Sequence, residues 1–322
     1  MSTRERDQRG SRPYPWLDRT PFIGPKAPHL QVQSILYNNE KEALRRSVES
    51  LARAAEISMA ESGTLRAVTL AVGDSSPLRC LEDEDVAELR AICEPYVFLT
   101  YTWFAANMGS ARGHNILGLE SEADFLFLMN PDIVVSPRTL DYLLEPFSRT
   151  AVGMTEGKQL PLEHPKDFDP VTGETSWASG ACSVIPTAVF QELGGYDADS
   201  FFLYCDDVDL AWRVRQLGLR IVHQPAAPIF HDKRVGLNLK GEPSYAERYF
   251  SAEAALILAH KWSRPEIVEA ILADFDLHGE EVHREAAREY RQRLDQDRLP
   301  LPVDPDHEIG QFVAGNHATH RF

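Results

Sequence analysis

The sequence has few cysteines, no long apolar run and no apolar leader. Its four cysteines form no C-x-x-C pair and match no zinc-binding spacing, so we expect free thiols, buried in a reducing compartment. The longest apolar stretch, around residues 253–259, is far shorter than the roughly 20 residues of a membrane-spanning helix. Residues 1–28 are polar and lack the core of a secretory signal. We therefore expect a cytoplasmic protein with no transmembrane span. Peripheral association with the inner face of the cell membrane is compatible with this expectation.

Positive charge is also scarce. The 322 residues contain 33 Lys and Arg against 49 Asp and Glu, a formal net charge of −16. A surface of that sign repels the phosphates of nucleic acids and of anionic lipids. We therefore expect no nucleic acid among the main partners.

Glycine-rich phosphate loops are missing where two enzyme classes would need them. A nucleotidyltransferase would carry glycines with Arg or Lys directly after its first strand, whereas this chain reads "LYNNEKEA" there. The segment "NMGSARGHN" does not match G-x-G-x-x-G, which argues against a dinucleotide-dependent oxidoreductase.

What the sequence does contain is a regular alternation of strand and helix patterns. Four apolar strands are predicted at 32–37, 65–72, 96–104 and 123–129, with helices at 40–57 and 86–93 between them. Ser136 and Pro137 then predict the start of a further helix. This order is typical of a Rossmann-like α/β fold, a mostly parallel central sheet flanked by helices.

The second half of the chain is less regular. Residues 153–176, with several glycines and prolines, predict a long irregular loop of the kind that often forms a lid. A strand is expected at 180–185, a helix from Asp206 to the glycine at 218, and mostly helix over 244–295. We expect four parts: a flexible arm (1–28), a catalytic domain (29–240), a C-terminal helical region (241–296) and a tail (297–322).

Polar residues follow each predicted strand, where open α/β sheets bind their ligands. Asp132 ends the buried strand of "FLFLMNPDIVVSP" and is held by Pro131. A hard carboxylate suits Mg²⁺ or Mn²⁺ bridging to substrate phosphates. The alternative is a turn former whose carboxylate binds nearby backbone N–H groups.

Three aspartates at one helix start form a second cluster. In "FFLYCDDVDLAWR", Asp206, Asp207 and Asp209 open the predicted helix. One carboxylate suffices to cap a helix, and three repel one another. At least one is therefore expected to face a cleft, where it can act as a general base toward a hydroxyl.

These segments together resemble family 2 inverting glycosyltransferases of the GT-A fold, and most closely the bacterial rhamnosyltransferase-type members. The resemblance covers about residues 30–235 and rests on segments that stand in the family's order. These are "LYNN", "GDSS", "NMGSARGHN", "FLFLMNPDIVVSP", "WASGACSVIP", "LGGYDADSFFLYCDDVDLAWRVRQLGLRIVHQP" and "IFH".

The resemblance implies a role for the polar residues at the strand ends. Asp132 matches the last Asp of the family's D-x-D motif, with Asn130 in place of the first, and His231 matches a histidine near the metal. Asp207 matches the general base, and Asp206 replaces a Glu beside it. The residues expected to line the nucleotide site are Tyr37, Asn38, Asp74, Asn107, Asn130 and Asp132.

The acceptor side and the C-terminal helices carry two further expectations. Trp177 and Gly180 of "TSWASG" are expected near the acceptor, Trp177 either as a platform for a sugar ring or as a core residue. The apolar face containing Tyr245 and Trp262 predicts packing on the catalytic domain, with homo-oligomer formation as the second interpretation.

The resemblance implies one reaction. A sugar moves, with inversion, from a nucleotide-diphosphate donor such as dTDP-rhamnose or a UDP-sugar to a hydroxyl of a glycan, glycolipid or other acceptor, with help from a divalent cation. The Q-x-x-R-W motif of processive synthases is missing, so a single addition is expected. The alternatives are a nucleotide-sugar binding protein without catalysis and a nucleotidyltransferase.

Overall fold

The computed structural model describes residues 27–149, 151–164, 166–231 and 244–318. Of the predicted arm only its last two residues belong to this described part, and the final four residues of the predicted tail lie outside it. The strands are β1 (His29–Leu36), β2 (Ala67–Asp74), β3 (Val97–Trp103), β4 (Phe125–Met129), β5 (Ile133–Val135), β6 (Val152–Leu160), β7 (Glu174–Thr175), β8 (Cys182–Pro186) and β9 (Arg220–His231).

The helices lie between and after these strands. They are α1 (Lys41–Glu56), α2 (Asp83–Cys93), α3 (Gly109–Gly118), α4 (Thr139–Leu144), α5 (Thr187–Glu192), α6 (Asp206–Gln216), α7 (Tyr245–Lys261), α8 (Pro265–Leu277) and α9 (Glu281–Asp295). One π-helical turn (Ile57–Glu61) extends α1, and one 3₁₀ turn (Glu145–Ser148) extends α4.

All nine strands join one sheet, in the order β3-β2-β1-β4-β8-β6-β9-β5, with β7 paired to β9. Strands β1 to β4 are mutually parallel, and β6 and β9 run in the same direction as these four. Strands β5, β7 and β8 run in the opposite direction. The mostly parallel sheet predicted from the sequence is therefore confirmed, and its antiparallel pairs lie in the half beyond β4.

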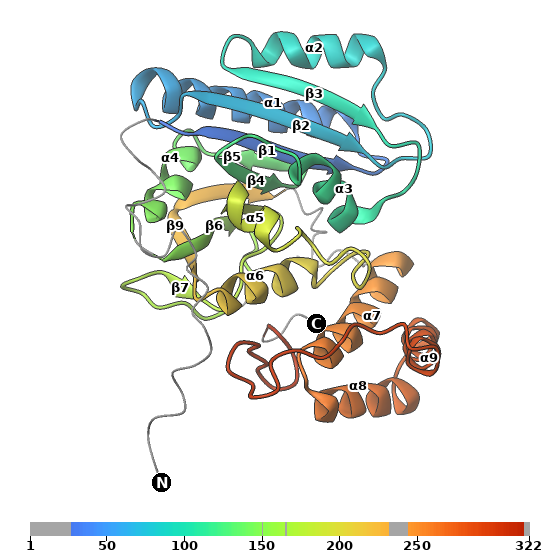
Figure 1. Ribbon diagram of the computed structural model, residues 1–322. Coiled ribbons are helices and arrows are strands. Elements are labelled where there is room, and N and C mark those ends of the chain that lie inside the picture. Colours follow the sequence, from blue (N-terminus) through green and yellow to red (C-terminus); the bar gives the residue numbers. More distant parts are fainter. Residues whose placement is uncertain (1–26, 150, 165, 232–243, 319–322) are drawn as a thin grey trace.

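Helices cover both faces of this sheet (Figure 1). Helices α1, α2 and α4 lie on one face, and α3, α5 and α6 on the other. Strand β4 shows why its sequence is continuously apolar. Phe125 and Phe127 belong to the core on the α1 face, whereas Leu126 and Leu128 belong to the core on the α6 face. A strand buried on both sides needs apolar residues at every position.

The predicted irregular loop at 153–176 is wrong in its first half, where β6 runs from Val152 to Leu160. The glycines that suggested a loop sit in the strand because its neighbours approach closely. A Cβ on Gly153 would lie 2.5 Å from Val214 Cγ1, and one on Gly157 would lie 2.7 Å from the Ala227 carbonyl oxygen. Glycine here permits packing, and does not mark a turn.

Two helix predictions also need correction. Helix α4 begins at Thr139, and not at Pro137, because Val135 still pairs with Ile229 in the sheet. Ser136 instead bonds the Thr139 hydroxyl, at 2.8 Å between the two oxygens. Helix α3 lies in the segment that we treated only as a polar strand end, and Gly113 and Gly118 within it lie against neighbouring side chains.

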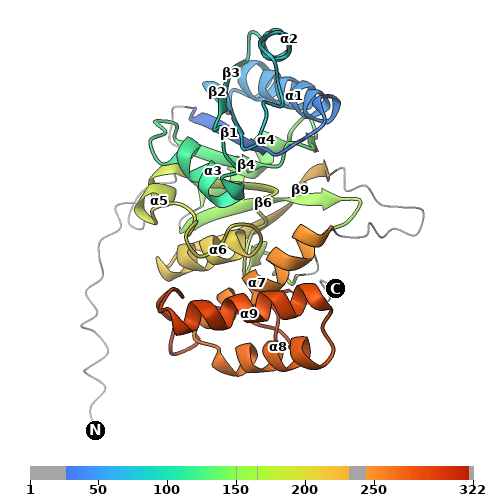
Figure 2. The ribbon, with the colours of Figure 1, turned by 90° about the vertical axis from the view of Figure 1, so that its right-hand side faces the viewer.

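The C-terminal helices pack on the rest of the protein. Figures 1 and 2 show α7, α8 and α9 gathered below α6. Of the expected apolar face of α7, Ile257 and Trp262 share one core with α6, whereas Tyr245 is exposed. The chain after α9 returns to this core, where Phe312 packs against Trp212 with ring centres 5.1 Å apart. Much of the region expected to be a tail is therefore packed on the protein.

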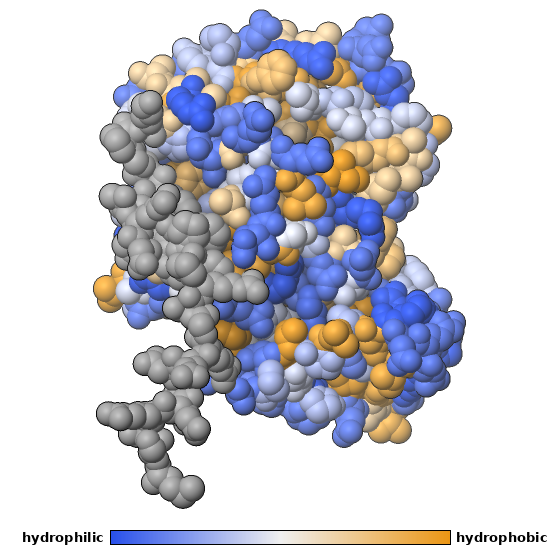
Figure 3. Space-filling model, viewed as in Figure 1, coloured by the Kyte–Doolittle hydropathy of each residue, from blue (hydrophilic) through white to orange (hydrophobic). Residues whose placement is uncertain are grey.

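The surface agrees with the charge balance of the sequence. The face shown in Figure 3 is mostly hydrophilic, in keeping with a net charge of −16. Across the described part of the chain, no helix is both long and apolar enough to cross a bilayer.

Candidate active site

The order of the parallel strands defines where a ligand can bind. The chain runs from β1 outward to β2 and β3 and then crosses back to β4 on the other side of β1, so the direction of winding reverses between β1 and β4. Ligands of such sheets bind at this point, beyond the carboxyl ends of the strands. Tyr37 and Asn38 follow β1 there, and Asn130 to Asp132 follow β4.

Asp74 shapes the rim beyond β2 and is not itself exposed. Its carboxylate accepts the Ser76 N–H at 2.9 Å, the Cys80 N–H at 2.7 Å and the Tyr101 hydroxyl proton. Burial raises the pKa of Asp74, but these hydrogen bonds outweigh it and hold that pKa below its usual range. With its oxygens engaged, Asp74 holds the turn that follows β2.

The turn at Ser76 is held from both sides. Asn38, whose φ is +54°, donates its N–H to the Ser76 hydroxyl at 2.9 Å. The indole N–H of Trp103 donates to the Ser76 carbonyl at 2.9 Å. Trp103 is 40% exposed and Tyr37 is 49% exposed, so the rim presents two aromatic rings. We did not assign Trp103 a role from the sequence, although a tryptophan at the end of a predicted strand was a usable signal.

Asn107 lies between β3 and α3. It is exposed, and its side-chain oxygen accepts the N–H of Gly109, the first residue of α3, at 3.1 Å. The amide therefore stabilises the start of α3, and its nitrogen points away from that bond.

The predicted metal residues lie together. His231 Nε2 lies 3.4 Å from Asp132 Oδ1 and 3.5 Å from Asn130 Nδ2. The pairing of Ile133 with His231 places Asp132 beside the end of β9. His231 Nδ1 lies 3.0 Å from the side-chain oxygen of Gln159, which can only accept, so Nδ1 carries the proton. Nε2 is then the ring nitrogen that faces the Asp132 carboxylate, and in a neutral imidazole it is available as a metal ligand.

Two electron-rich atoms facing each other fit a divalent cation. Gln159, which the sequence gave no reason to choose, orients the imidazole in the way that ligating histidines require. Among the described residues there is no group of three or more His, Cys, Asp and Glu side chains that could hold a metal. A cation bound by Asp132 and His231 would take its other ligands from water or substrate.

The three aspartates of α6 divide into separate tasks. Asp209 is fully buried and bonds Arg213 Nε at 2.8 Å, Lys261 Nζ at 2.8 Å and the Trp262 indole at 3.1 Å. This residue ties α6 to α7. Asp207 is half-buried, and its Oδ2 accepts the Gly180 N–H at 2.9 Å.

Asp206 is the buried neighbour of Asp207. Burial, reinforced by the charge of Asp207, raises the pKa of Asp206 to about 8. At neutral pH Asp206 is therefore largely protonated. Tyr204 and Cys205, directly before α6, have φ of +67° and +55°, a backbone that side chains rarely adopt. This strained turn presents the two carboxyl groups.

The sheet register brings the two clusters to the same end of the molecule. Met129 of β4 pairs with Cys182 of β8, and the Asn130 N–H donates to the Ala181 carbonyl at 3.0 Å. Gly180, which holds Asp207, is the next residue along. Asp132 follows Asn130 by two residues. The predicted metal residues and the predicted base therefore flank one junction, the carboxyl end of β4.

Trp177 does not form the sugar platform that we considered. It is 1% exposed, its ring lies 4.0 Å from Lys166 Nζ, and it packs edge to face with His317. A buried ring cannot stack on a substrate, so the core interpretation is correct for Trp177.

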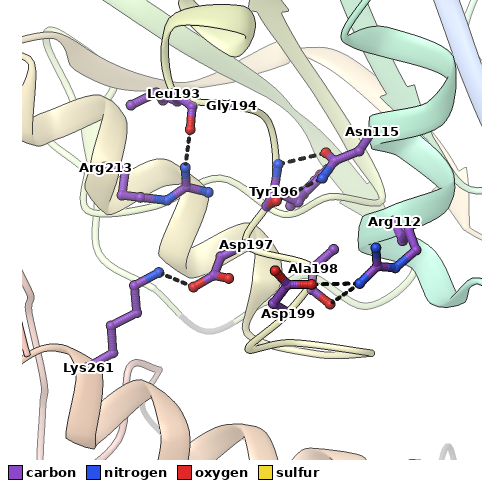
Figure 4. A pocket seen from close by; sticks show the side chains of 10 residues that line it. All are labelled: Arg112, Asn115, Leu193, Gly194, Tyr196, Asp197, Ala198, Asp199, Arg213 and Lys261. Carbon is purple, nitrogen blue, oxygen red and sulfur yellow. Dashed lines mark hydrogen bonds and ion pairs between the residues drawn. The ribbon is translucent and has the colours of Figure 1, made fainter. Parts of the chain in front are cut away.

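A polar cavity of about 450 Å³ lies apart from these residues, between α3, the turn after α5, and α6 (Figure 4). Its three cations are engaged within the protein. Arg213 donates to the Leu193 carbonyl at 3.0 Å, Lys261 pairs with Asp197 at 2.6 Å, and Arg112 pairs with Asp199 at 2.7 Å. None of the predicted site residues lines this cavity.

The chain resembles known glycosyltransferases in part of its sequence and in most of its fold. No protein-family model matches it. It is 33% identical over 66 residues to N-acetylglucosaminyl-diphospho-decaprenol L-rhamnosyltransferase from two strains of Mycobacterium tuberculosis, CDC 1551 / Oshkosh and ATCC 25618 / H37Rv. The match covers 20% of this chain and 21% of the relative, so the chain spans about a fifth of the length of these curated relatives.

Two solved structures share the fold. One is the mannosyltransferase PcManGT from Pyrobaculum calidifontis in complex with GDP-Man and Mn²⁺, with a TM-score of 0.52, 15% identity, and coverage of 88% of this chain and 86% of that one. The other is GalNAc-T7 with UDP, GalNAc and Mn²⁺, with a TM-score of 0.59, 12% identity, and coverage of 87% and 56%. The chain has the GT-A fold, as the sequence predicted.

Proposed function

We propose that this protein is a metal-dependent, inverting glycosyltransferase that moves one sugar from a nucleotide-diphosphate donor to an acceptor hydroxyl. The observation that carries the proposal is the junction at the end of β4. The facing pair Asp132 and His231 lies on one side of it, and Asp207 lies on the other. The GT-A fold and the Mn²⁺ complexes of both solved relatives support the same chemistry.

Each residue of the site then has a task. Asp132 and His231 would hold the cation, which stabilises charge on the departing diphosphate. Gln159 keeps the proton on His231 Nδ1, so that Nε2 stays available as a ligand. Asp207 accepts the proton of the acceptor hydroxyl while that oxygen bonds to the anomeric carbon and the bond to the diphosphate breaks. One base opposite the leaving group gives inversion.

The donor and acceptor classes rest on similarity. The matched relative is by its printed name a rhamnosyltransferase acting on a diphospho-decaprenol, which favours dTDP-rhamnose or a UDP-sugar as donor and a lipid-linked glycan as acceptor. The exposed rings of Tyr37 and Trp103 at the rim favour contact with a nucleobase. Such a reaction fits cell-envelope or polysaccharide biosynthesis in the cytoplasm, at the inner face of the membrane where lipid-linked acceptors are found.

Donor hydrolysis tests the proposal. Purified protein is incubated with a panel of nucleotide-diphosphate sugars and Mn²⁺, and release of the nucleoside diphosphate is measured with and without EDTA. We expect slow hydrolysis of one donor, abolished by EDTA and strongly reduced in Asp207→Asn. Donor binding without turnover in the wild type would indicate a nucleotide-sugar binding protein. Formation of a sugar nucleotide from a nucleoside triphosphate and a sugar phosphate would indicate a nucleotidyltransferase.

A further inference from the structure

A buried ion pair beneath the site has no part in the reaction described so far. Lys166 Nζ lies 2.5 Å from the Glu156 carboxylate, and the two side chains are 4% and 1% exposed. Glu156 lies in the middle of β6, on the same face as Met154, whose side chain belongs to the core on the α6 side. Burying two charges is costly even when they are paired, so such a pair is weak evidence of a stabilising role.

The pair holds the main chain of residues 177–179 at both ends. Lys166 Nζ donates to the Trp177 carbonyl at 3.0 Å. Glu156 Oε2 accepts the N–H of Ser179 at 2.8 Å, and Glu156 Oε1 lies 2.9 Å from His223 Nδ1. Each charge therefore bonds both its partner and one main-chain group of the segment.

The next amide in the chain reaches the catalytic cluster. Gly180 N–H donates to Asp207 Oδ2 at 2.9 Å. A Cβ on Gly180 would lie 3.3 Å from Asp207 Cβ, so the main chain runs directly against this aspartate. The path from the ion pair to the Asp207 carboxylate is one segment of four residues, anchored at two of them.

We propose that Glu156 and Lys166 are positioning residues, which fix residues 177–180 so that the Gly180 amide holds the Asp207 carboxylate in its reactive orientation. This inference rests on the proposed function, in which Asp207 is the base. Lys166 also contacts Trp177 twice, through the hydrogen bond to its carbonyl and through its ring, 4.0 Å from Nζ.

The test is a double-mutant cycle between the ion pair and Asp207. Replacing both charges together, Glu156→Gln with Lys166→Met, keeps the volume and leaves no unpaired charge in the interior. We expect kcat for hydrolysis of the donor that the screen selects to fall by about 10–100-fold, as misplaced catalytic groups do. The affinity for the nucleoside diphosphate and Mn²⁺, measured by calorimetry, should stay within about twofold because the site for the diphosphate is not touched.

In the Asp207→Asn background the same double replacement should lower the rate by less than about twofold, because residues that act as a unit are not additive. The matched control is the ion pair of Glu253 and Arg293, at 2.8 Å between α7 and α9. Glu253→Gln with Arg293→Met should leave kcat unchanged in both backgrounds. Equal losses of rate with and without Asp207 would overturn the proposal.

A second readout does not depend on turnover. The amide resonance of Gly180 in ¹⁵N-labelled protein should move in the same direction in the Glu156→Gln/Lys166→Met variant and in Asp207→Asn, and should stay in place in the control pair. An unmoved Gly180 resonance in the ion-pair variant overturns the positioning role. A moved resonance together with full activity of Asp207→Asn instead overturns the assignment of Asp207 as base.

A milder variant tests the same proposal. If the double replacement does not fold, Glu156→Asp keeps the charge balance and withdraws the carboxylate from the Ser179 N–H by one methylene. We expect a smaller fall in kcat, again absent in the Asp207→Asn background, with the Gly180 resonance displaced. A fall that is undiminished in that background contradicts the proposal.

Discussion

His231 Nε2 lies 3.4 Å from Asp132 Oδ1, while His231 Nδ1 donates its proton to Gln159. A neutral imidazole would face the carboxylate with a lone pair, and a divalent cation bound by both atoms would relieve the repulsion between them. The pair therefore leads to a prediction about metal dependence.

Asp132→Ala and His231→Ala should each weaken the Mn²⁺-dependent binding of UDP or dTDP by about 10-fold or more, and leave metal-free binding unchanged. Calorimetry with Mn²⁺ and with EDTA measures both. Glu253→Gln with Arg293→Met is the matched control, because this ion pair joins α7 to α9 and contains none of the predicted site residues. Equal Mn²⁺-dependent affinity in wild type and Asp132→Ala would show that Asp132 is a turn residue only.

Asp207→Asn removes the base and keeps its shape. The rate of transfer or donor hydrolysis should fall by about 10²–10⁴, with nucleotide affinity close to wild type. Steady-state kinetics and calorimetry on the same preparation separate the two quantities. Asp209→Asn serves as the contrast, because Asp209 bonds Arg213, Lys261 and Trp262 and should mainly lower stability. An inactive Asp206→Asn beside a nearly active Asp207→Asn would exchange the two roles.

The raised pKa of Asp206 predicts how stability depends on pH. Its pKa rises from an ordinary value of 3.8 to about 8 on folding, so between these values the folded state holds a proton that the unfolded state lacks. Stability must then fall as the pH rises through this window. Asp206→Asn has no such proton to lose.

Thermal unfolding from pH 4 to pH 9 measures this effect. As the pH rises toward 8, the melting temperature of the wild type should fall relative to that of Asp206→Asn. The two proteins should converge toward pH 4. Parallel curves across the whole range would show that Asp206 is not the group that holds the proton.

Trp177→Ala should destabilise the protein by about 3–5 kcal/mol, the usual cost of removing a large buried aromatic side chain. Denaturant unfolding followed by circular dichroism gives the value. Trp103→Ala provides the comparison, since its ring is 40% exposed, and it should weaken nucleotide binding with little change in stability. A stable Trp177→Ala with a raised acceptor KM would restore the sugar platform.

Much of the fold could be predicted from local sequence patterns. The apolar run of β4 and the helix stop at Gly218, with a φ of +80°, follow from burial and backbone chemistry that nearby residues determine. Strand β6 was missed because Gly153 and Gly157 are explained only by side chains and main chain from distant segments. Helix α3 was missed for a similar reason.

The candidate site could also be predicted from the sequence only in part. Asp132 and the aspartates of α6 could be chosen because each follows or opens a recognisable element. The task of each aspartate could not, since Asp209 is distinguished only by Lys261 and Trp262, some 50 residues later in the chain. Gln159 and the pair of Glu156 and Lys166 lie in segments without a motif, and only the fold brings them to the site.

The left-handed turn at Tyr204 and Cys205 stores backbone strain directly before the two carboxyl groups. Each such residue costs about 1–2 kcal/mol that glycine would not. Tyr204→Gly would relax the backbone directly before Asp206 and Asp207, and would also remove the packing of the Tyr204 ring against the core of α6. The same relaxation would leave the side chains of Asp206 and Asp207 less fixed in their orientation. If Asp207 is the base, a substitution that relieves the strain of this turn should therefore lower kcat even where the protein still folds.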